Sequence, residues 1–120
     1  MPKSMQEPTF LILTALADGP QHGYGIMSDV EQISEGRTRL RAGTLYAALD
    51  RLQAEELIAP DREEVVDGRL RRYYRLTEDG AAALAAEVEA LQQRTRIAAR
   101  RLAAFPSLRG GTTPAFGGLR

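Results

Sequence analysis

The C-terminal part of the chain carries an apolar seam that one small domain cannot cover. The seam positions are separated alternately by four and three residues: Leu84, Val88, Leu91, Thr95, Ala98, Leu102 and Phe105. Side chains with this heptad spacing lie along one side of an α-helix and pack against another helix. A helix from Thr77 to Ala104 would be roughly 40 Å long at 1.5 Å per residue. The 76 residues before it form a smaller globule than that, so part of the seam is expected to contact another chain.

The N-terminal segment from Thr9 to Ala17 is apolar on nearly every side. Such a run suits a buried strand or a helix with more than one apolar face, and its Leu and Ala residues favour the helix. A helix that is apolar all round needs a second partner besides its own domain. Asp18-Gly19-Pro20 ends the segment.

A second helix is expected from His22 to Ile33, because apolar residues recur there with helical spacing. Gly23 and Gly25 near its start cost helix stability, which indicates close approach of another element. Residues 37–41 alternate weakly and suggest a very short strand.

The third expected helix runs from Ala42 to Glu56, with a core stripe of leucines at positions 45, 49 and 52. At 100° per residue, the opposite face is small and polar. That face comprises Gly43, Thr44, Ala47, Asp50 and Arg51.

Residues 57–76 predict a β-hairpin, since Asp67-Gly68 between two β-prone runs is typical of a two-residue type I′ turn. This turn would place Val66 opposite Arg69 and Glu64 opposite Arg71. The hairpin would be a cationic ribbon with an apolar underside. Charged hairpins are also often only solvated edges, and the acids near the turn can pair with these arginines.

The order of elements predicts a mainly α fold with a small β-hairpin. It is the order of a winged helix-turn-helix domain, here residues 1–76, with a long dimerisation helix over 77–105 and a disordered tail over 106–120. In such a domain the third helix enters a DNA major groove about 12 Å wide and the hairpin is the wing. Arginines flank both elements: Arg37, Arg39, Arg41, Arg51, Arg69, Arg71, Arg72 and Arg75.

Three motifs together resemble the PadR family of transcriptional regulators: His22-Gly23-Tyr24-Gly25, the run from Leu40 to Tyr46, and the run from Arg71 to Gly80. The resemblance implies a cytoplasmic prokaryotic homodimer that binds palindromic operator DNA, usually as a repressor, with the first and last helices building the dimer. Some relatives hold flat aromatic ligands with a tryptophan of the last helix. This chain has no Trp, so such a stacking site is not expected, and any small-molecule effector is unidentified.

The sequence departs from the family where a capping residue and a Pro commonly precede Gly43, because Arg41 and Ala42 stand there. Arg41 cannot cap the helix as Ser or Asn would. The expected DNA-binding residues are Arg39, Arg41, Gly43, Thr44, Tyr46, Ala47, Arg51, Arg69, Arg71 and Arg72. The expected dimer interface consists of Phe10, Leu13, Leu84, Val88, Leu91, Ala98 and Leu102.

The composition excludes several kinds of functional site. The chain has no Cys and one His, and its 16 basic residues balance 16 acidic residues. Thiolate and multi-histidine metal sites are therefore excluded, no catalytic constellation is evident, and no cofactor is expected. No apolar run approaches the roughly 20 residues of a membrane span. Because the net charge is zero, a winged-helix module that binds proteins instead of DNA stays an open alternative.

Overall fold

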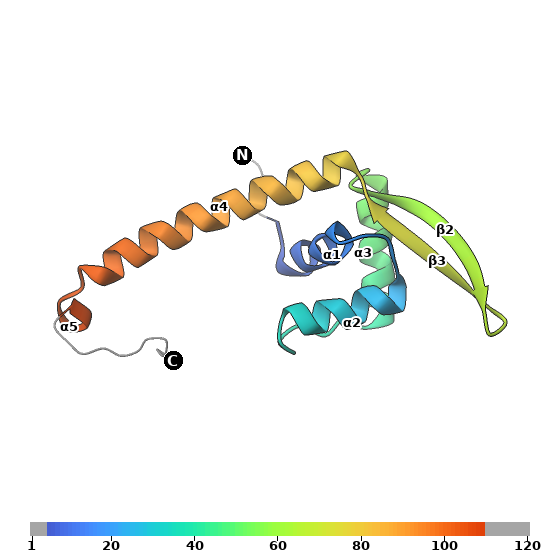
Figure 1. Ribbon diagram of the computed structural model, residues 1–120, viewed down its shortest axis with the longest axis horizontal. Coiled ribbons are helices and arrows are strands. Elements are labelled where there is room, and N and C mark those ends of the chain that lie inside the picture. Colours follow the sequence, from blue (N-terminus) through green and yellow to red (C-terminus); the bar gives the residue numbers. More distant parts are fainter. Residues whose placement is uncertain (1–4, 110–120) are drawn as a thin grey trace. The chain divides into compact units, whose positions relative to one another are not determined.

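The computed structural model describes residues 5–109, and it contains helices and a small antiparallel sheet (Figure 1). Its elements are α1 (Glu7–Ala17), β1 (Gln21–His22), α2 (Gly23–Ile33), α3 (Ala42–Ala54), β2 (Ile58–Val66), β3 (Arg69–Leu76), α4 (Glu78–Ala103) and α5 (Pro106–Arg109). The mainly α winged-helix fold is therefore as predicted. The chain divides into two compact units, of which the first ends at Glu87 and the second begins at Val88. The first unit thus extends beyond the predicted boundary at residue 76 and includes the start of α4.

The core of the first unit lies where α1, α2 and α3 meet the sheet. Its largest fully buried side chains are Ile12, Leu13, Leu16, Ile26, Val30, Leu45, Leu49, Leu52 and Ile58. The leucine stripe of α3 is part of this core, as its spacing predicts. Tyr74 contributes its ring from β3 and is 8% exposed, so one face of the sheet closes the core.

The first helix begins earlier than predicted. α1 starts at Glu7 and includes Pro8 in its first turn. Backbone N–H groups in the first turn have no intrahelical acceptor, so a proline there costs the helix no hydrogen bond. The helix therefore includes two residues before the apolar segment that begins at Thr9. The turn after α1 passes through Gly19 with φ 142°, a conformation that favours glycine.

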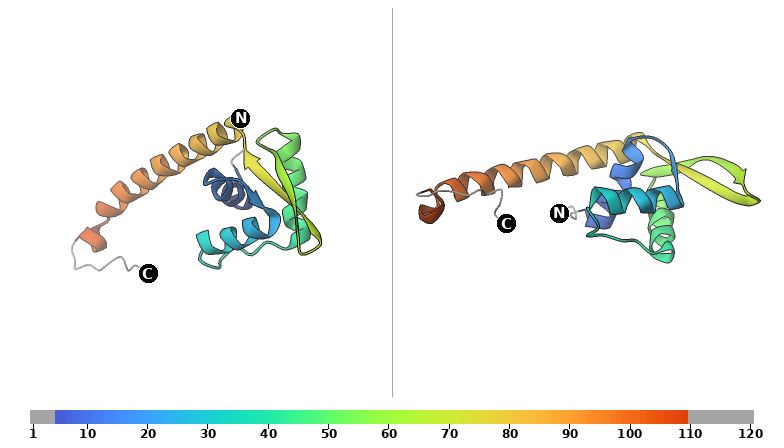
Figure 2. Two further views of the ribbon diagram at one scale, coloured as in Figure 1. Left: turned by 45° about the vertical axis from the view of Figure 1, so that its right-hand side comes forward. Right: turned by 60° about the horizontal axis from the view of Figure 1, so that its bottom comes forward.

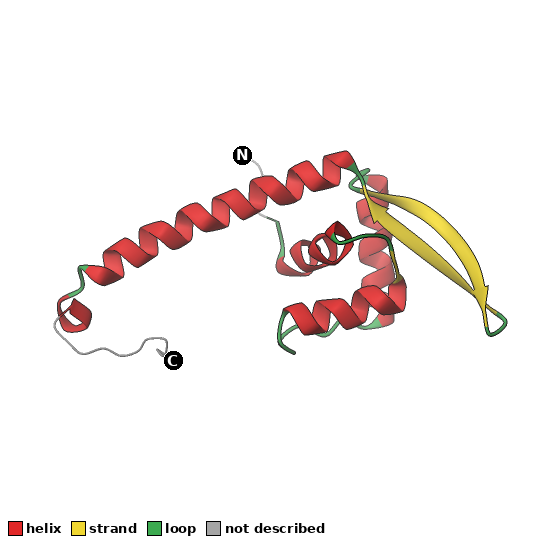
Figure 3. Ribbon diagram, viewed as in Figure 1, coloured by secondary structure: helices red, strands yellow, loops and turns green. Residues whose placement is uncertain are grey.

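The sheet has the strand order β1-β3-β2, and Figure 3 shows its two long strands, β2 and β3, in yellow. Val66 pairs with Arg69 and Glu64 with Arg71, which confirms the predicted register. Asp67 and Gly68 both have positive φ, 53° and 77°, as a type I′ turn requires.

The prediction of a strand over residues 37–41 is wrong, because these residues form a loop. The short strand that joins the hairpin in the sheet is instead β1, Gln21–His22, which pairs with Tyr73 and Tyr74 of β3. A strand of two residues is too short to produce an alternating pattern, so the sequence gives no periodic signal for it.

Thr77 caps α4. Its Oγ1 accepts a hydrogen bond from the Gly80 amide at 2.9 Å and donates one to the Glu56 carbonyl at 2.7 Å. Gly80 is buried against the Leu57 carbonyl, where a Cβ atom would collide with the backbone. The start of α4 is therefore fixed to the turn between α3 and β2.

α4 ends at Ala103, and α5 follows as one short turn. The residues of α5 are helical although they belong to the segment predicted as a disordered tail. The rest of that segment, residues 110–120, lies outside the described residues. Among residues 5–109, no helix is both long and apolar enough to cross a lipid bilayer.

Candidate nucleic-acid interface

The outer face of α3 is exposed, small and polar. Leu45, Leu49 and Leu52 have no exposed surface, and the residues on the other side of the helix are exposed: Gly43, Thr44, Ala47, Asp50 and Arg51. An α-helix with such a face can approach another surface closely. In Figures 1 and 2 the wing projects beside α3, and the N-terminal end of α2 lies close to both.

The N-terminus of α3 is open to solvent. Arg41 occupies the N-cap position with extended backbone and makes no side-chain capping hydrogen bond, as predicted. A Cβ atom on Gly43 would meet nothing within 4 Å. The first amide groups of α3 therefore have no capping side chain, and they carry the positive end of the helix dipole.

A groove of about 480 Å³ separates the wing from the start of α2 and from α3. It is lined by His22, Gly23, Tyr24, Tyr46, Val66, Asp67, Arg69, Leu70, Arg71 and Arg72. Gly23 is needed at this point, because a Cβ atom there would collide with the Tyr46 ring. The close approach that the glycines predicted is therefore found between α2 and α3.

The wing is less cationic than its sequence suggests. Arg72 pairs with Glu63 at 3.4 Å, and Arg62 pairs with Asp61 and Glu64. Within the described residues, Arg41, Arg69 and Arg71 have no carboxylate at ion-pairing distance, and these three lie at the start of α3 and on β3 next to the turn.

His22 lies at the junction of β1 and α2. Its ring packs against Tyr73 with the centroids 5.3 Å apart, and its Nδ1 atom is buried without a hydrogen-bond partner among the described residues. Burial and the nearby Arg71 guanidinium lower the pKa of the imidazole, although Glu64 acts in the opposite direction. His22 is therefore neutral at pH 7 and adds no charge to the groove.

Besides Arg72, two further arginines of the predicted DNA-binding set have partners within the chain. Arg51 donates a hydrogen bond to Thr9 and pairs with Glu55 at 3.6 Å. Arg39 pairs with Glu31 at 3.2 Å. The structure thus groups Tyr46, Arg69, Arg71 and Arg72 around the groove and gives Arg39 and Arg51 other contacts.

The groove also contains residues outside the predicted set, namely His22 and Tyr24. Tyr24 is 73% exposed, so its ring is available to a partner molecule. The signal that could have identified both residues is the pair Gly23 and Gly25, which marked this helix start as a place of close approach.

The residues predicted for a dimer interface differ in exposure. Leu84 is half-buried against the core, whereas Val88, Leu91, Ala98 and Leu102 are exposed on α4. Phe10 is half-buried, and Leu13 is fully buried in the chain's own core. Leu13 therefore has no surface left for a second chain, because α1 places it against its own domain.

The comparisons with known proteins include one family model that matches more than half of the chain. The model of the transcriptional regulator PadR-like family matches residues 12–86. Transcriptional regulator Rv3488 of Mycobacterium tuberculosis is 40% identical over 85 residues, which are 71% of this chain and 76% of that protein. An uncharacterized 37.1 kDa protein in transposon TN4556 of Streptomyces fradiae is 49% identical over 63 residues, or 52% of this chain, but the chain spans only 17% of that protein.

Solved structures share the fold. A PadR family transcription regulator from Clostridium difficile aligns with a TM-score of 0.66 and 26% identity, covering 81% of this chain and 99% of that one. Bacillus subtilis PadR, solved in complex with operator DNA, aligns with a TM-score of 0.62 and 23% identity over 69% of this chain and 48% of that one. The fold of the chain and the family match over residues 12–86 lead to the same conclusion: this protein belongs to the PadR-like family of transcriptional regulators.

Proposed function

We propose that the protein is a homodimeric repressor that binds an inverted-repeat operator in double-stranded DNA. One observation carries this proposal: three arginines that have no carboxylate partner among the described residues, Arg41, Arg69 and Arg71, flank the exposed face of α3. Phosphate contacts supply most of the non-specific affinity of a DNA-binding protein. A chain of zero net charge can provide those contacts when several unpaired cations lie together on one surface.

In this proposal α3 enters the major groove, where the side chains of Thr44 and Ala47 face base edges. Gly43 and the uncapped amides of the first turn approach a phosphate, which the positive end of the helix dipole favours. Arg41 contacts the neighbouring phosphate. Arg51 is left out of the proposed base contacts, because Thr9 and Glu55 hold its guanidinium.

The wing contacts the adjacent DNA backbone. Arg69 and Arg71 bind phosphates, and the groove beside them admits a sugar-phosphate strand next to Tyr46. Bacillus subtilis PadR, which has this fold, was solved in complex with operator DNA, and this supports DNA as the partner.

Dimerisation occurs along the exposed seam of α4. Val88, Leu91 and Leu102 are 37%, 36% and 53% exposed in the single chain, and a second copy of the helix would cover them by heptad packing. The two-fold symmetry then places two copies of α3 about one helical turn of DNA apart, which requires an inverted repeat.

Repression follows if the operator overlaps a promoter, because the bound dimer blocks access to it. A small-molecule effector would release the repressor by favouring a dimer whose two α3 helices no longer match the half-site spacing.

The test is fluorescence anisotropy with DNA from upstream of the protein's own gene and a shuffled duplex of equal length. Affinity for the upstream DNA in the nanomolar range, against a non-specific Kd of about 10⁻⁴–10⁻⁶ M at physiological salt, is the expected result. Arg69→Ala/Arg71→Ala is expected to weaken binding and to reduce the salt slope by about 0.9 per lost phosphate contact. Arg100→Ala/Arg101→Ala, which removes two exposed cations of α4, is the charge-matched control.

Equal weak binding to both duplexes would show that the operator does not lie upstream of the protein's own gene. A library of genomic fragments would then be used to locate the operator. Absence of binding even at low salt would overturn the proposal and favour a module that binds another protein.

A further inference from the structure

The wing contains a bulge close to its attachment to the domain. Pro60 pairs with Tyr74 and Glu63 with Arg72, and the register shifts between them. Asp61 and Arg62 therefore both lie opposite Tyr73, one residue more than a regular ladder allows. A bulge of this kind bends a strand and redirects its side chains.

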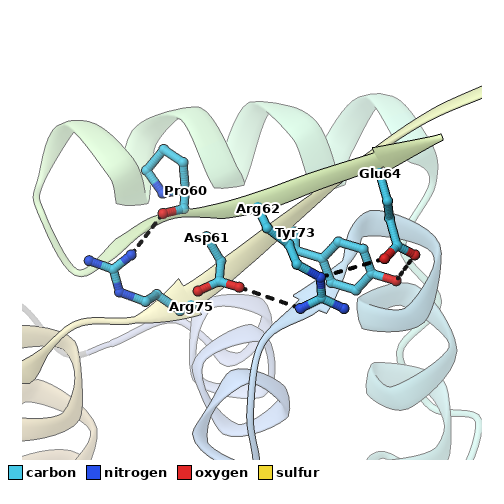
Figure 4. A network of polar contacts seen from close by, with 6 residues as sticks. All are labelled: Pro60, Asp61, Arg62, Glu64, Tyr73 and Arg75. Carbon is cyan, nitrogen blue, oxygen red and sulfur yellow. Dashed lines mark hydrogen bonds and ion pairs between the residues drawn. The ribbon is translucent and has the colours of Figure 1, made fainter.

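Arg62 uses the bulge to contact Tyr73 (Figure 4). Its guanidinium carbon lies 3.8 Å from the centroid of the Tyr73 ring, a cation–π arrangement. The Tyr73 hydroxyl donates a hydrogen bond to Glu64 Oε1 at 3.0 Å, and Arg62 Nε lies 3.6 Å from Glu64 Oε2. Three side chains from two strands thus form one closed set of contacts.

This set is connected to the body of the domain. The Tyr73 ring packs on His22, and the backbone of Tyr73 pairs with that residue in β1. His22 immediately precedes α2. The direction of the wing beyond the bulge therefore depends on how Tyr73 is held.

The charge of Arg62 is satisfied within the wing. Asp61 Oδ2 lies 3.5 Å from its Nη1 atom, in addition to the contact with Glu64. Two carboxylates around one guanidinium disfavour the approach of a phosphate. Arg69 and Arg71, in contrast, have no such partners within the described residues.

We propose that Arg62 is a positioning residue of the wing: by holding Tyr73 and Glu64 at the bulge, it sets the direction in which Arg69 and Arg71 meet DNA. This inference rests on the proposed DNA-binding function. Arg62 itself makes no phosphate contact.

The experiment compares Arg62→Ala in the otherwise native chain and in the Arg69→Ala/Arg71→Ala background. Operator affinity and its salt slope are measured by anisotropy, and folding is followed by the Tm of each variant. If Arg62 acts only through the two arginines, Arg62→Ala weakens binding more than about threefold in the native chain and less than about twofold in the background that lacks them. Arg62→Ala is expected to lower the salt slope in the native chain by no more than the loss of Arg69 and Arg71 does, and to leave it unchanged in the background that lacks them, because Arg62 itself contacts no phosphate.

Two further readouts separate positioning from other roles. Arg62→Lys keeps the charge but lacks the planar guanidinium that contacts the Glu64 carboxylate and the Tyr73 ring together. It is therefore expected to restore less than half of the binding free energy that Arg62→Ala loses. Equal losses in both backgrounds, full rescue by Arg62→Lys, a salt slope that Arg62→Ala lowers in the background without Arg69 and Arg71, or no loss at all would each overturn the proposal.

The proposal also has a test that needs no DNA. Hydrogen exchange of the wing amides from Val65 to Leu70 is expected to quicken in Arg62→Ala while the Tm of the domain is retained. Unchanged exchange would refute the positioning role, whether or not the native protein binds DNA. If the native protein binds no DNA but exchange is faster in the variant, only the proposed function is refuted.

Discussion

Arg51 of α3 donates a hydrogen bond from Nη2 to Thr9 Oγ1 in the first turn of α1, at 2.9 Å. Thr9 is only 7% exposed, so its hydroxyl depends on this contact for part of its hydrogen bonding. The contact joins the helix proposed to read DNA to the first helix of the chain. It also gives a cation on the outer face of α3 a structural task.

Arg51→Ala is therefore expected to lower the free energy of unfolding by about 1 kcal/mol, because the buried Thr9 hydroxyl loses its donor. Urea denaturation of Arg51→Ala, Thr9→Val and the double variant measures the coupling between the two residues. We expect the double variant to be no less stable than Arg51→Ala. Additive losses would show that the two side chains act independently.

Gly80→Ala is expected to destabilise the protein by about 1–3 kcal/mol, since the new Cβ atom would collide with the Leu57 carbonyl, which is backbone and cannot move alone. Gly43→Ala is the matched control, because its Cβ atom would meet nothing within 4 Å, and it is expected to stabilise by up to about 1 kcal/mol. Chemical denaturation of both variants checks the pair. Equal effects would mean that the start of α4 does not depend on this packing.

Glu56→Gly is expected to stabilise the protein by up to about 1 kcal/mol. Glu56 directly follows the C-cap of α3 and has φ 64°, a left-handed conformation that costs a residue with a Cβ atom more than it costs glycine. Glu56→Ala keeps the Cβ atom and is expected to be neutral, so the difference between the two variants in a urea titration isolates the backbone term. A destabilised Glu56→Gly would indicate that the Glu56 side chain contributes more than its backbone strain costs.

The sequence predicted the elements that follow from regular apolar spacing or from a short turn motif. The leucine stripe of α3 and the turn at Asp67-Gly68 each depend on a local rule, and each is found in the structure. The strand at Gln21–His22 was not predicted, because it exists only where β3 offers an edge to pair with.

The candidate site was harder to predict than the fold. Sequence alone does not show which arginines meet carboxylates across a turn or from another helix, as Arg72 and Arg51 do. Counting cations therefore overestimates the charge that the wing offers to DNA. The groove around Tyr46 likewise depends on three elements that meet only in the folded chain.

Leu91→Asp is expected to prevent dimerisation, because Leu91 lies in the middle of the α4 seam and is 36% exposed in the single chain. A buried charge at a heptad core position is strongly unfavourable. Gln93→Asp, on the opposite side of the helix, adds the same charge outside the seam and should leave the dimer intact. Light scattering of both variants decides the matter, and a Leu91→Asp protein with the mass of a dimer would refute the seam.

Stability is expected to fall as the pH drops below about 6.5, and His22 is the reason. Burial and Arg71 lower the pKa of its imidazole below the ordinary value of 6.5, against the opposing effect of Glu64. The unfolded chain then binds a proton at a higher pH than the folded chain, so acidification favours unfolding between the two pKa values. Above this window His22 is neutral in both states and contributes no pH dependence.

The measurement is the free energy of unfolding of the native protein and of His22→Gln from pH 8 to pH 5. The difference between the two proteins cancels the titration of their shared carboxylates. We expect this difference to be constant above about pH 7.5. Below about pH 6.5 we expect the native protein to lose more free energy of unfolding than His22→Gln does. Arg71→Gln should reduce the pH dependence, because it removes the cation that opposes protonation of His22. A native protein that gained stability relative to His22→Gln on acidification would show instead that folding raises the pKa of His22, as an interaction with Glu64 stronger than the effect of burial would do.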